Sequence, residues 1–234
     1  MNKFRAIGLA VVVAVLLIGC QPTASVAPSV APSEAERSVE PSSAAGLPEG
    51  PHVFWDELVR IEVTIPAPGW FGEELEGILI KNDNPDPPEG AGMIVFDGPL
   101  YVYGDPCQWS TTTPDTPAGT VDELVAALSA QASRDATAPV DVTVGGFTGK
   151  SITLHVPDDA VFDDCDQNTF GSWTVGPGLE PYRYHQGPGQ IDELWILDVN
   201  GVPVIIDTAY YAGTPTADVE ELRAIVESAT FQSP

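Results

Sequence analysis

The stretch Leu194-Trp-Ile-Leu-Asp-Val-Asn-Gly-Val-Pro-Val-Ile-Ile-Asp207 decides the fold class of this chain. Two runs rich in β-branched and large apolar residues flank Asn200 and Gly201, and both of these turn residues tolerate the positive φ of a type I′ turn. The stretch therefore predicts a β-hairpin with a two-residue loop. Pro203 has no amide hydrogen, so its nitrogen is expected to face outward near the turn or at a sheet edge.

Short strand-like segments recur before this hairpin. Residues 61–65 alternate apolar and polar side chains and stop at the breaker cluster 66–70, whose Trp70 is expected to cap the core. Gly, Pro, Asn or Asp separates the segments, as antiparallel strands require. The further strand candidates are residues 77–81, 93–96, 100–103, 140–144, 151–156 and 171–175.

Two segments have the one-sided apolar pattern of a helix that lies on a sheet. Thr120 and Glu123 form a capping box at the start of the first, and Pro215 suits the first turn of the second. The apolar face of the first helix consists of Val121, Leu124, Val125, Leu128 and Ala132. That of the second consists of Val219, Leu222, Ile225, Val226 and Ala229. The order of elements predicts a single α+β domain, a mainly antiparallel sheet flanked by two helices.

These features together resemble the PsbP-like superfamily, which includes photosystem extrinsic subunits and bacterial lipoproteins. The resemblance rests on residues 61–66, on Pro68-Gly69-Trp70, on the central helix and late hairpin, and on a closing helix that ends in residues 227–231. It covers most of residues 56–232. The resemblance implies an antiparallel sheet flanked by helices and a role in binding or assembly rather than catalysis. It implies no catalytic residue for this chain.

The N-terminus has the layout of an export signal. Lys3 and Arg5 precede an apolar run over residues 7–18. This run, at about 1.5 Å per residue, reaches about 18 Å and falls short of the roughly 30 Å hydrocarbon core of a membrane. The segment therefore predicts export followed by removal.

The residues around the predicted cleavage point, Leu17-Ile18-Gly19-Cys20, resemble the lipobox of bacterial lipoproteins. In that family the cysteine thiol is acylated, for example with palmitate, and the signal peptide is cleaved before it. The resemblance implies that residues 1–19 are removed and that Cys20 anchors the chain to a cell membrane, facing the extracytoplasmic side. Two or three acyl chains give a stable anchor. The alternative is an ordinary signal peptide with an incidental cysteine.

The mature chain divides into a tether and a domain. Residues 20–50 are rich in Ala, Pro and Ser and contain no aromatic residue, so they predict a disordered tether behind the lipidated cysteine. Residues 51–234 contain no second linker and predict a single domain.

Cys107 and Cys165 are the two cysteines that remain once Cys20 carries lipid. An even pair in an oxidising compartment predicts a disulfide. The alternatives are a metal pair or a redox pair. Both are disfavoured, because neither cysteine lies in a CxxC motif and no histidine is near either one in sequence.

The chain is strongly acidic, with a formal net charge of −25 over 234 residues. Removal of Lys3 and Arg5 with the signal peptide makes the mature chain more negative still. Such a charge excludes nucleic acid and anionic lipid headgroups as partners of the folded domain. The charge permits cation binding, an envelope protein partner, or simply solubility at a crowded surface.

No pattern in the sequence indicates catalysis or a cofactor. His52, His155 and His185 lie far apart and outside any metal-ligand spacing, and Gly171-Ser172-Trp173 lacks the second glycine of a nucleophile elbow. We therefore expect no catalytic residues, no cofactor and no enzyme. His155 is expected at a strand end, and His185 on the surface of an edge strand.

Acidic loops are the best candidates for a metal site, because Ca²⁺ takes six to eight oxygen ligands. One is residues 82–86 with Glu89. The sharper candidate surrounds Cys165 and consists of Asp158, Asp159, Asp163, Asp164 and Asp166. Neither follows the EF-hand spacing, and solvated acidic loops are the alternative.

Aromatic residues are the remaining feature, because they can stack on sugars or mark an interface, although most are expected to fill the core. They are Trp55, Trp70, Trp109, Trp173, Trp195, Tyr182, Tyr184, Tyr210 and Tyr211. The leading hypothesis is a membrane-tethered, non-catalytic binding or assembly module. The alternatives are a Ca²⁺-stabilised or sugar-binding surface domain, and an envelope hydrolase with an unfamiliar site.

Overall fold

The structure is a computed structural model, and it describes residues 46–73, 75 and 77–232. The export signal, the lipobox at Cys20 and most of the tether fall on residues 1–45, outside the described residues. Leu47 already packs against the core, and its amide donates to the carbonyl of Trp70 at 2.7 Å. Leu47, which precedes the predicted start of the domain at residue 51, thus takes part in the packed core.

The predicted hairpin lies at the centre of the fold. Strands β12 (Ile191–Val199) and β13 (Val202–Tyr210) pair antiparallel, and Val199 and Val202 close the two-residue loop. The turn residues Asn200 and Gly201 have φ of 55° and 88°, as a type I′ turn requires. Pro203 lies one residue outside the pairing of β13 with β5, so its missing amide removes no hydrogen bond from that ladder.

The hairpin belongs to an eight-stranded antiparallel sheet, called the large sheet below. Its strand order is β3-β4-β5-β13-β12-β9-β7, and β8 also pairs with β9. The other strands are β3 (Trp70–Glu73), β4 (Ile78–Lys81), β5 (Ala91–Asp97), β7 (Asp135–Ala136), β8 (Val140–Val144) and β9 (Phe147–His155). Strands β4, β5, β8 and β9 match predicted segments. The ends of β8 are as predicted, those of the other three are shifted, and β3 and β7 were not predicted.

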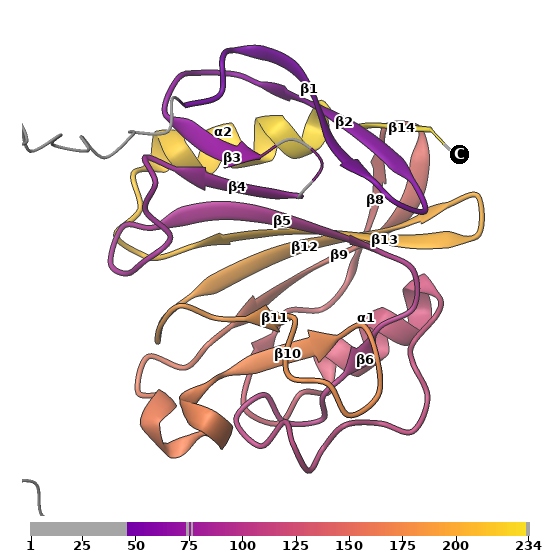
Figure 1. Cartoon of the computed structure of the whole chain (residues 1–234), viewed down its shortest axis with the longest axis vertical. Coiled ribbons are helices and arrows are strands. Elements are labelled where there is room, and N and C mark those ends of the chain that lie inside the picture. Colours follow the sequence, from indigo (N-terminus) through magenta and orange to yellow (C-terminus); the bar gives the residue numbers. More distant parts are fainter. Residues whose placement is uncertain (1–45, 74, 76, 233–234) are drawn as a thin grey trace, which may run out of the picture. The chain divides into compact units, whose positions relative to one another are not determined.

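One face of the large sheet is covered by helix α2 (Thr216–Glu227) and by a small sheet of β1 (Gly50–Asp56), β2 (Arg60–Ile65) and β14 (Thr230–Gln232) (Figure 1). The predicted apolar face of α2 and Ala229 after it are buried. Trp70 is fully buried in the same core, as expected. Burial of this apolar layer is what holds α2 on the sheet.

The opposite face carries helix α1 (Val121–Ser129) and a second small sheet of β6 (Tyr101–Val102), β10 (Gly171–Thr174) and β11 (Arg183–Tyr184) (Figure 1). The predicted capping box is present, because the Thr120 hydroxyl accepts from the Glu123 amide at 3.3 Å and the Glu123 carboxylate accepts from the Gly119 amide at 2.9 Å. Ala132 was wrongly assigned to the apolar face. The helix ends before it, and Ala132 is exposed.

The two predicted half-cystines form a disulfide in the structure, with an S–S distance of 1.99 Å. Cys165 lies between two short 3₁₀ helices, η1 (Phe162–Asp164) and η2 (Asp166–Asn168). The disulfide ties this segment to the loop that follows β6. The part of the chain that the structure describes is thus the predicted α+β fold, with two α-helices and antiparallel sheets, and no helix within it has the length and hydropathy to span a membrane.

Candidate functional site

A cluster of charged side chains is buried between the large sheet and the small sheet of β6, β10 and β11. Each residue of this cluster is at most 7% exposed. Its members, called the buried charge cluster below, are Arg134, Arg183, His185, Asp192 and Asp207. They come from the segment before β7, from β11 and the residue after it, and from both strands of the central hairpin. The fold thus brings together groups that lie far apart in sequence.

Two arginines and two aspartates of the cluster form a chain of ion pairs. Asp192 binds Arg134 through one carboxylate oxygen and Arg183 through the other, the latter at 2.8 Å. The Nε of Arg183 donates to Oδ2 of Asp207 at 2.6 Å. Burial alone would raise the pKa of Asp192, but Arg134 and the other nearby cationic groups hold this pKa well below its usual value. Pairing is what makes these charges tolerable in the interior.

His185 takes part in the same cluster, and its predicted surface position was wrong. It is 4% exposed, and its ring packs edge-on against Phe170. Burial lowers the pKa of His185 to about 3, so the ring is neutral at physiological pH. The reason for the error lies in the alternation of the segment: Tyr182 and Tyr184 point outward, while the polar Arg183 and His185 point inward.

Ser172, His185 and Asp192 are arranged in the order of a catalytic triad. Nε2 of His185 lies 2.8 Å from the Ser172 hydroxyl, and Nδ1 lies 3.3 Å from Asp192. Ser172 is fully buried, however, and its hydroxyl also accepts a hydrogen bond from Arg134 at 2.9 Å. A triad serine must reach the carbonyl of a substrate. This array therefore serves to join β10, β12 and the residue after β11.

One oxygen of the cluster has no hydrogen-bond partner. Oδ1 of Asp207 is buried and unpartnered among the described residues, although Oδ2 of the same carboxylate binds Arg183. Burial raises the pKa of Asp207 to about 7, which outweighs the opposite effect of Arg183. A buried acceptor without a donor costs about 1–3 kcal/mol, so it marks a position where a ligand donor would be favourable.

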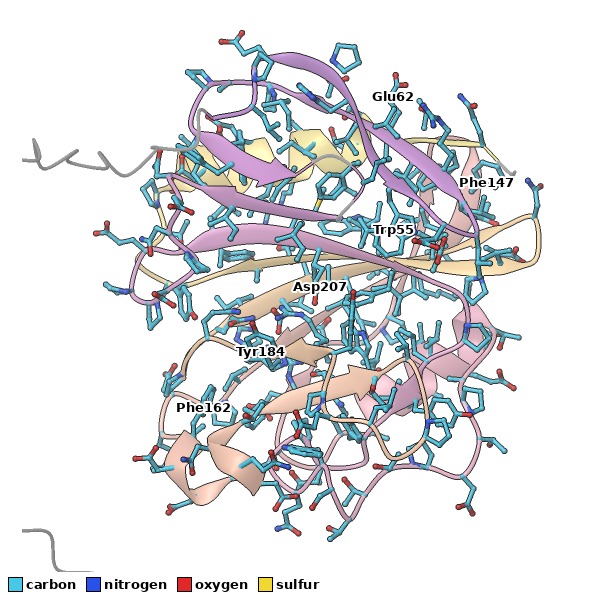
Figure 2. All side chains as sticks on the ribbon, viewed as in Figure 1. Trp55, Glu62, Phe147, Phe162, Tyr184 and Asp207 are labelled. Atoms are coloured by element: carbon cyan, nitrogen blue, oxygen red, sulfur yellow. A yellow bond between two sulfur atoms is a disulfide. The ribbon has the colours of Figure 1, made fainter. Side chains whose placement is uncertain are left out.

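A pocket of about 510 Å³, called the apolar pocket below, is lined in part by Asp207. It lies between β4, β5 and β13 of the large sheet and the segment 181–186. Figure 2 shows two of its lining residues, Asp207 and Tyr184, on the same side of the large sheet. Among the described residues that line it, the charged ones are Arg183 and Asp207. The apolar ones include Ile78, Ile80, Met93, Ile94, Pro181 and Tyr182.

The apolar pocket exists because two small residues face each other where the covering sheet ends. Gly92 of β5 pairs with Ala209 of β13, so this part of the large sheet carries little side-chain bulk. Strand β11, at the edge of the covering sheet, is only two residues long. Ile78 and Tyr182 consequently stay 40% and 53% exposed at the rim. A mostly apolar hollow with a few polar groups at its base is the usual form of a small-molecule site.

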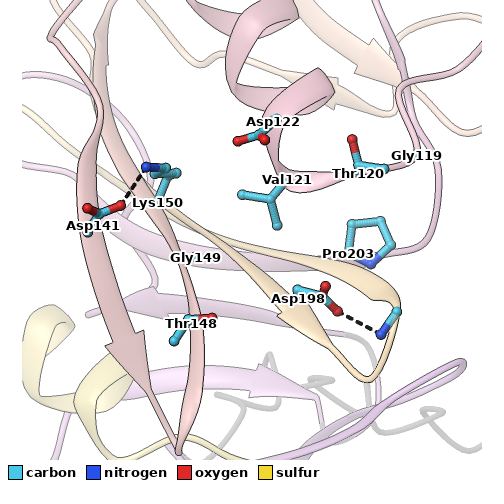
Figure 3. A pocket seen from close by; sticks show the side chains of 11 residues that line it. Gly119, Thr120, Val121, Asp122, Asp141, Thr148, Gly149, Lys150, Asp198 and Pro203 are labelled. Atoms are coloured by element: carbon cyan, nitrogen blue, oxygen red, sulfur yellow. Dashed lines mark hydrogen bonds and ion pairs between the residues drawn. The ribbon is translucent and has the colours of Figure 1, made fainter.

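A second hollow of about 430 Å³ lies at the start of α1 and has a mixed polar and apolar lining (Figure 3). Lys150 pairs with Asp141 at 2.5 Å, and the Asp198 carboxylate accepts from the amide of Gly201 at 2.6 Å. None of the buried unpartnered atoms found in the described chain belongs to a residue that lines this hollow. The apolar pocket is therefore the stronger candidate site.

The five aspartates around Cys165 are not gathered into a group of three or more ligands among the described residues. The carboxylate of Asp166 accepts hydrogen bonds from the hydroxyl and the amide of Ser110, at 2.6 and 2.9 Å, and these bonds lower the pKa of Asp166. No group of three or more His, Cys, Asp or Glu side chains within residues 46–73, 75 and 77–232 is placed to hold a metal ion. This finding includes Asp158, Asp159, Asp163 and Asp164, and also Glu89.

The aromatic residues mostly fill the core, as expected. Trp70, Trp109 and Trp173 are buried, and Trp55 and Trp195 pack partly buried against the core. Tyr182 and Tyr184 are exposed, and both line the apolar pocket. His155 ends β9 with an exposed side chain, also as predicted.

No protein-family model matches the chain, and no curated protein matches it either. Solved structures do show a distant likeness. LpqN of Mycobacterium tuberculosis, described as involved in cell envelope biogenesis, has 12% identity over 81% of this chain and 87% of its own, with a TM-score of 0.39. A protein of Bacteroides thetaiotaomicron has 11% identity over 80% of this chain and 48% of its own, with a TM-score of 0.35.

A cyanobacterial PsbP from Synechocystis has 13% identity over 74% of this chain and 86% of its own, with a TM-score of 0.35. A PsbP protein is thus among the structures that the chain is similar to. At these TM-scores the likenesses establish no common family and carry no argument on function. The PsbP-like resemblance of the sequence stays a prediction, and function has to be argued from the site.

Proposed function

We propose that this chain is a lipid-anchored extracytoplasmic module that binds a small, largely apolar molecule in the apolar pocket and does not transform it. The observation that carries the proposal is the pocket itself. It has about 510 Å³ of space, apolar walls, and the buried pair of Arg183 and Asp207 at its base. Its volume lies within the usual range of ligand sites, roughly 300–1,000 Å³.

The arrangement of titratable groups favours binding over catalysis. Asp207 lines the pocket, but His185 and Asp192, the groups that would complete an acid–base or nucleophilic constellation, do not. General acid–base catalysis needs both partners within hydrogen-bond reach of the reacting atoms. An envelope hydrolase therefore has no support in the buried Ser172 array.

The lipid anchor is proposed from the sequence around Cys20, with the membrane as the partner that it implies. The disulfide between Cys107 and Cys165 agrees with an oxidising, extracytoplasmic compartment. The strong negative charge argues against nucleic acid. A protein partner in the envelope remains part of the proposal, with no surface assigned to it.

Filling the apolar pocket should abolish binding. In the Ala209→Phe variant a ring occupies the space beside Gly92, and we expect the affinity for the uncharged fluorescent probe N-phenyl-1-naphthylamine to fall by about tenfold or more. The measurement is a fluorescence titration on the full chain, with Cys20→Ser in every sample to remove the predicted acylation site.

The matched control is Val140→Phe, which adds the same ring at a position that is 60% exposed on β8 and does not line the pocket. It should bind the probe as the parent chain does. Equal binding by parent and Ala209→Phe, with both folded by circular dichroism, would place the probe elsewhere and contradict the proposal.

A further inference from the structure

Asp207 and Arg183 are the charged residues that line the apolar pocket, and Arg183 is already paired. Each of its three nitrogens donates one hydrogen bond within the protein: Nε to Asp207, Nη1 to the carbonyl of Tyr184 at 2.5 Å, and Nη2 to Asp192 at 2.8 Å. Oδ2 of Asp207 is occupied by Arg183 as well. Oδ1 of Asp207 is what remains, since it lacks a partner among the described residues. A ligand can satisfy this oxygen only by donating a hydrogen bond.

The charge of the buried charge cluster decides which kind of ligand group, anionic, cationic or uncharged, can best donate this hydrogen bond. With both aspartates ionised, Asp192 and Asp207 balance Arg134 and Arg183, and His185 is neutral. A ligand anion would meet Asp207 and an arginine whose charge is already shared by two carboxylates. A ligand cation would add an uncompensated charge to a neutral buried cluster. An uncharged donor completes the hydrogen bonds and adds no charge, so it has the lowest cost of burial.

We propose that the ligand is an uncharged amphiphile whose terminal hydroxyl donates a hydrogen bond to Oδ1 of Asp207 while its apolar body contacts Ile78, Ile80 and Ile94. This inference rests on the proposed function and names the chemical class of its ligand. The isoleucines lie on β4 and β5, on the same side of the large sheet as Asp207. The pocket is therefore lined by these apolar side chains and by Asp207 together.

The protonation state of Asp207 should decide whether the pocket prefers a ligand that carries a hydroxyl. The charged groups that act on Asp207 are Arg183 of β11, Asp192 of β12 and Arg134 from the segment before β7, and burial raises the pKa of Asp207 to about 7. Above that pH the carboxylate accepts from a hydroxyl. Below it, the proton lies on Oδ1 because Oδ2 holds Arg183, and the same atom then donates. An alcohol and an ether can both accept from it, but the alcohol then leaves its own hydroxyl hydrogen without an acceptor, so the ether should become the preferred ligand at low pH.

The isomers 1-decanol and 1-methoxynonane test the donor directly, because they share one composition and differ in whether the oxygen carries a hydrogen. Each is used to displace N-phenyl-1-naphthylamine from the full chain with Cys20→Ser. About one pH unit above the pKa of Asp207, the alcohol should bind about tenfold more tightly than the ether. About one unit below this pKa the ratio should fall and favour the ether.

The Asp207→Asn variant should invert the preference between the two isomers. This test compares a ratio of affinities, so it does not depend on the absolute affinity of the variant. Its amide oxygen is the partner that Arg183 Nε requires, so the amide NH₂ faces the pocket and donates. Both isomers can accept from this NH₂, but the alcohol leaves its hydroxyl hydrogen unpaired, so the ether should then bind more tightly at any pH where the protein is folded. Asp141→Asn is the control, since Asp141 is an exposed carboxylate outside the pocket, and it should keep the ratio of the parent.

The outcomes separate the two proposals. If the parent chain bound the two isomers equally and the Ala209→Phe variant bound neither, the proposed hydroxyl donor would be wrong. The proposed binding function would still stand. Failure of the parent chain to bind either isomer or the probe would overturn the binding function and this inference with it. An unchanged isomer ratio in Asp207→Asn would also count against Asp207 as the acceptor.

Discussion

Replacing Asp192 with alanine should lower the free energy of unfolding by about 3–5 kcal/mol, because it removes one partner of a buried ion pair. Asp192 is fully buried and is the shared partner of Arg134 and Arg183. Its loss leaves two buried guanidinium groups with a single carboxylate, Asp207, between them. Urea unfolding of the full chain with Cys20→Ser, followed by circular dichroism, gives the free energy directly.

The control for this prediction is Asp141→Ala, which breaks the ion pair with Lys150 at the surface. The side chain of Asp141 is 87% exposed in that pair, so the unfolding midpoint should barely change. A similarly small effect of Asp192→Ala would mean that the two arginines find other partners, and it would contradict the central role given to Asp192.

Removing the disulfide should cost about 4 kcal/mol, as estimated for the closure of a chain loop of this length. Cys107 and Cys165 are 58 residues apart in sequence and join the loop after β6 to the segment between η1 and η2. The double variant Cys107→Ala, Cys165→Ala should therefore unfold at a much lower urea concentration than the parent.

A reducing agent provides the matched comparison for the disulfide. It should lower the unfolding midpoint of the parent chain toward that of the double variant and leave the double variant unchanged. If reduction and the double substitution both left stability untouched, the disulfide would play no part in holding the fold.

Local chemistry explains which elements could be predicted from the sequence. The type I′ turn at Asn200 and Gly201 needs only the conformational preferences of those two residues, and the box of Thr120 and Glu123 needs only neighbours three residues apart. The apolar faces of both helices follow from a period of 3.6 residues. These features are determined within a few residues, so the structure reproduces them.

The candidate site depends on contacts that no local pattern encodes. Asp207 ends the predicted hairpin and Asp192 lies two residues before it, and only their positions in phase with buried Ile205 and Leu194 signal that they face inward. His185 was predicted on an exposed edge because the segment around it has polar residues on its buried side. Buried charged side chains are stable only when each is paired, and the ion-pair partners here come from elements that are distant in sequence.

The apolar pocket could not be predicted from the sequence, for a related reason. Its hollow results from the pairing of Gly92 with Ala209 and from the point where β11 stops, and both depend on sheet register. Tyr182 and Tyr184 were among the aromatic residues considered for stacking on sugars. The structure instead places them at the rim of an apolar hollow.

The most direct test of the account is a crystal structure of the full chain, carrying Cys20→Ser, with saturating 1-decanol. The account predicts density for the alcohol between β4, β5 and the segment 181–186, with its oxygen within hydrogen-bond distance of Oδ1 of Asp207. An empty pocket under these conditions, or an alcohol bound only elsewhere on the protein, would contradict it.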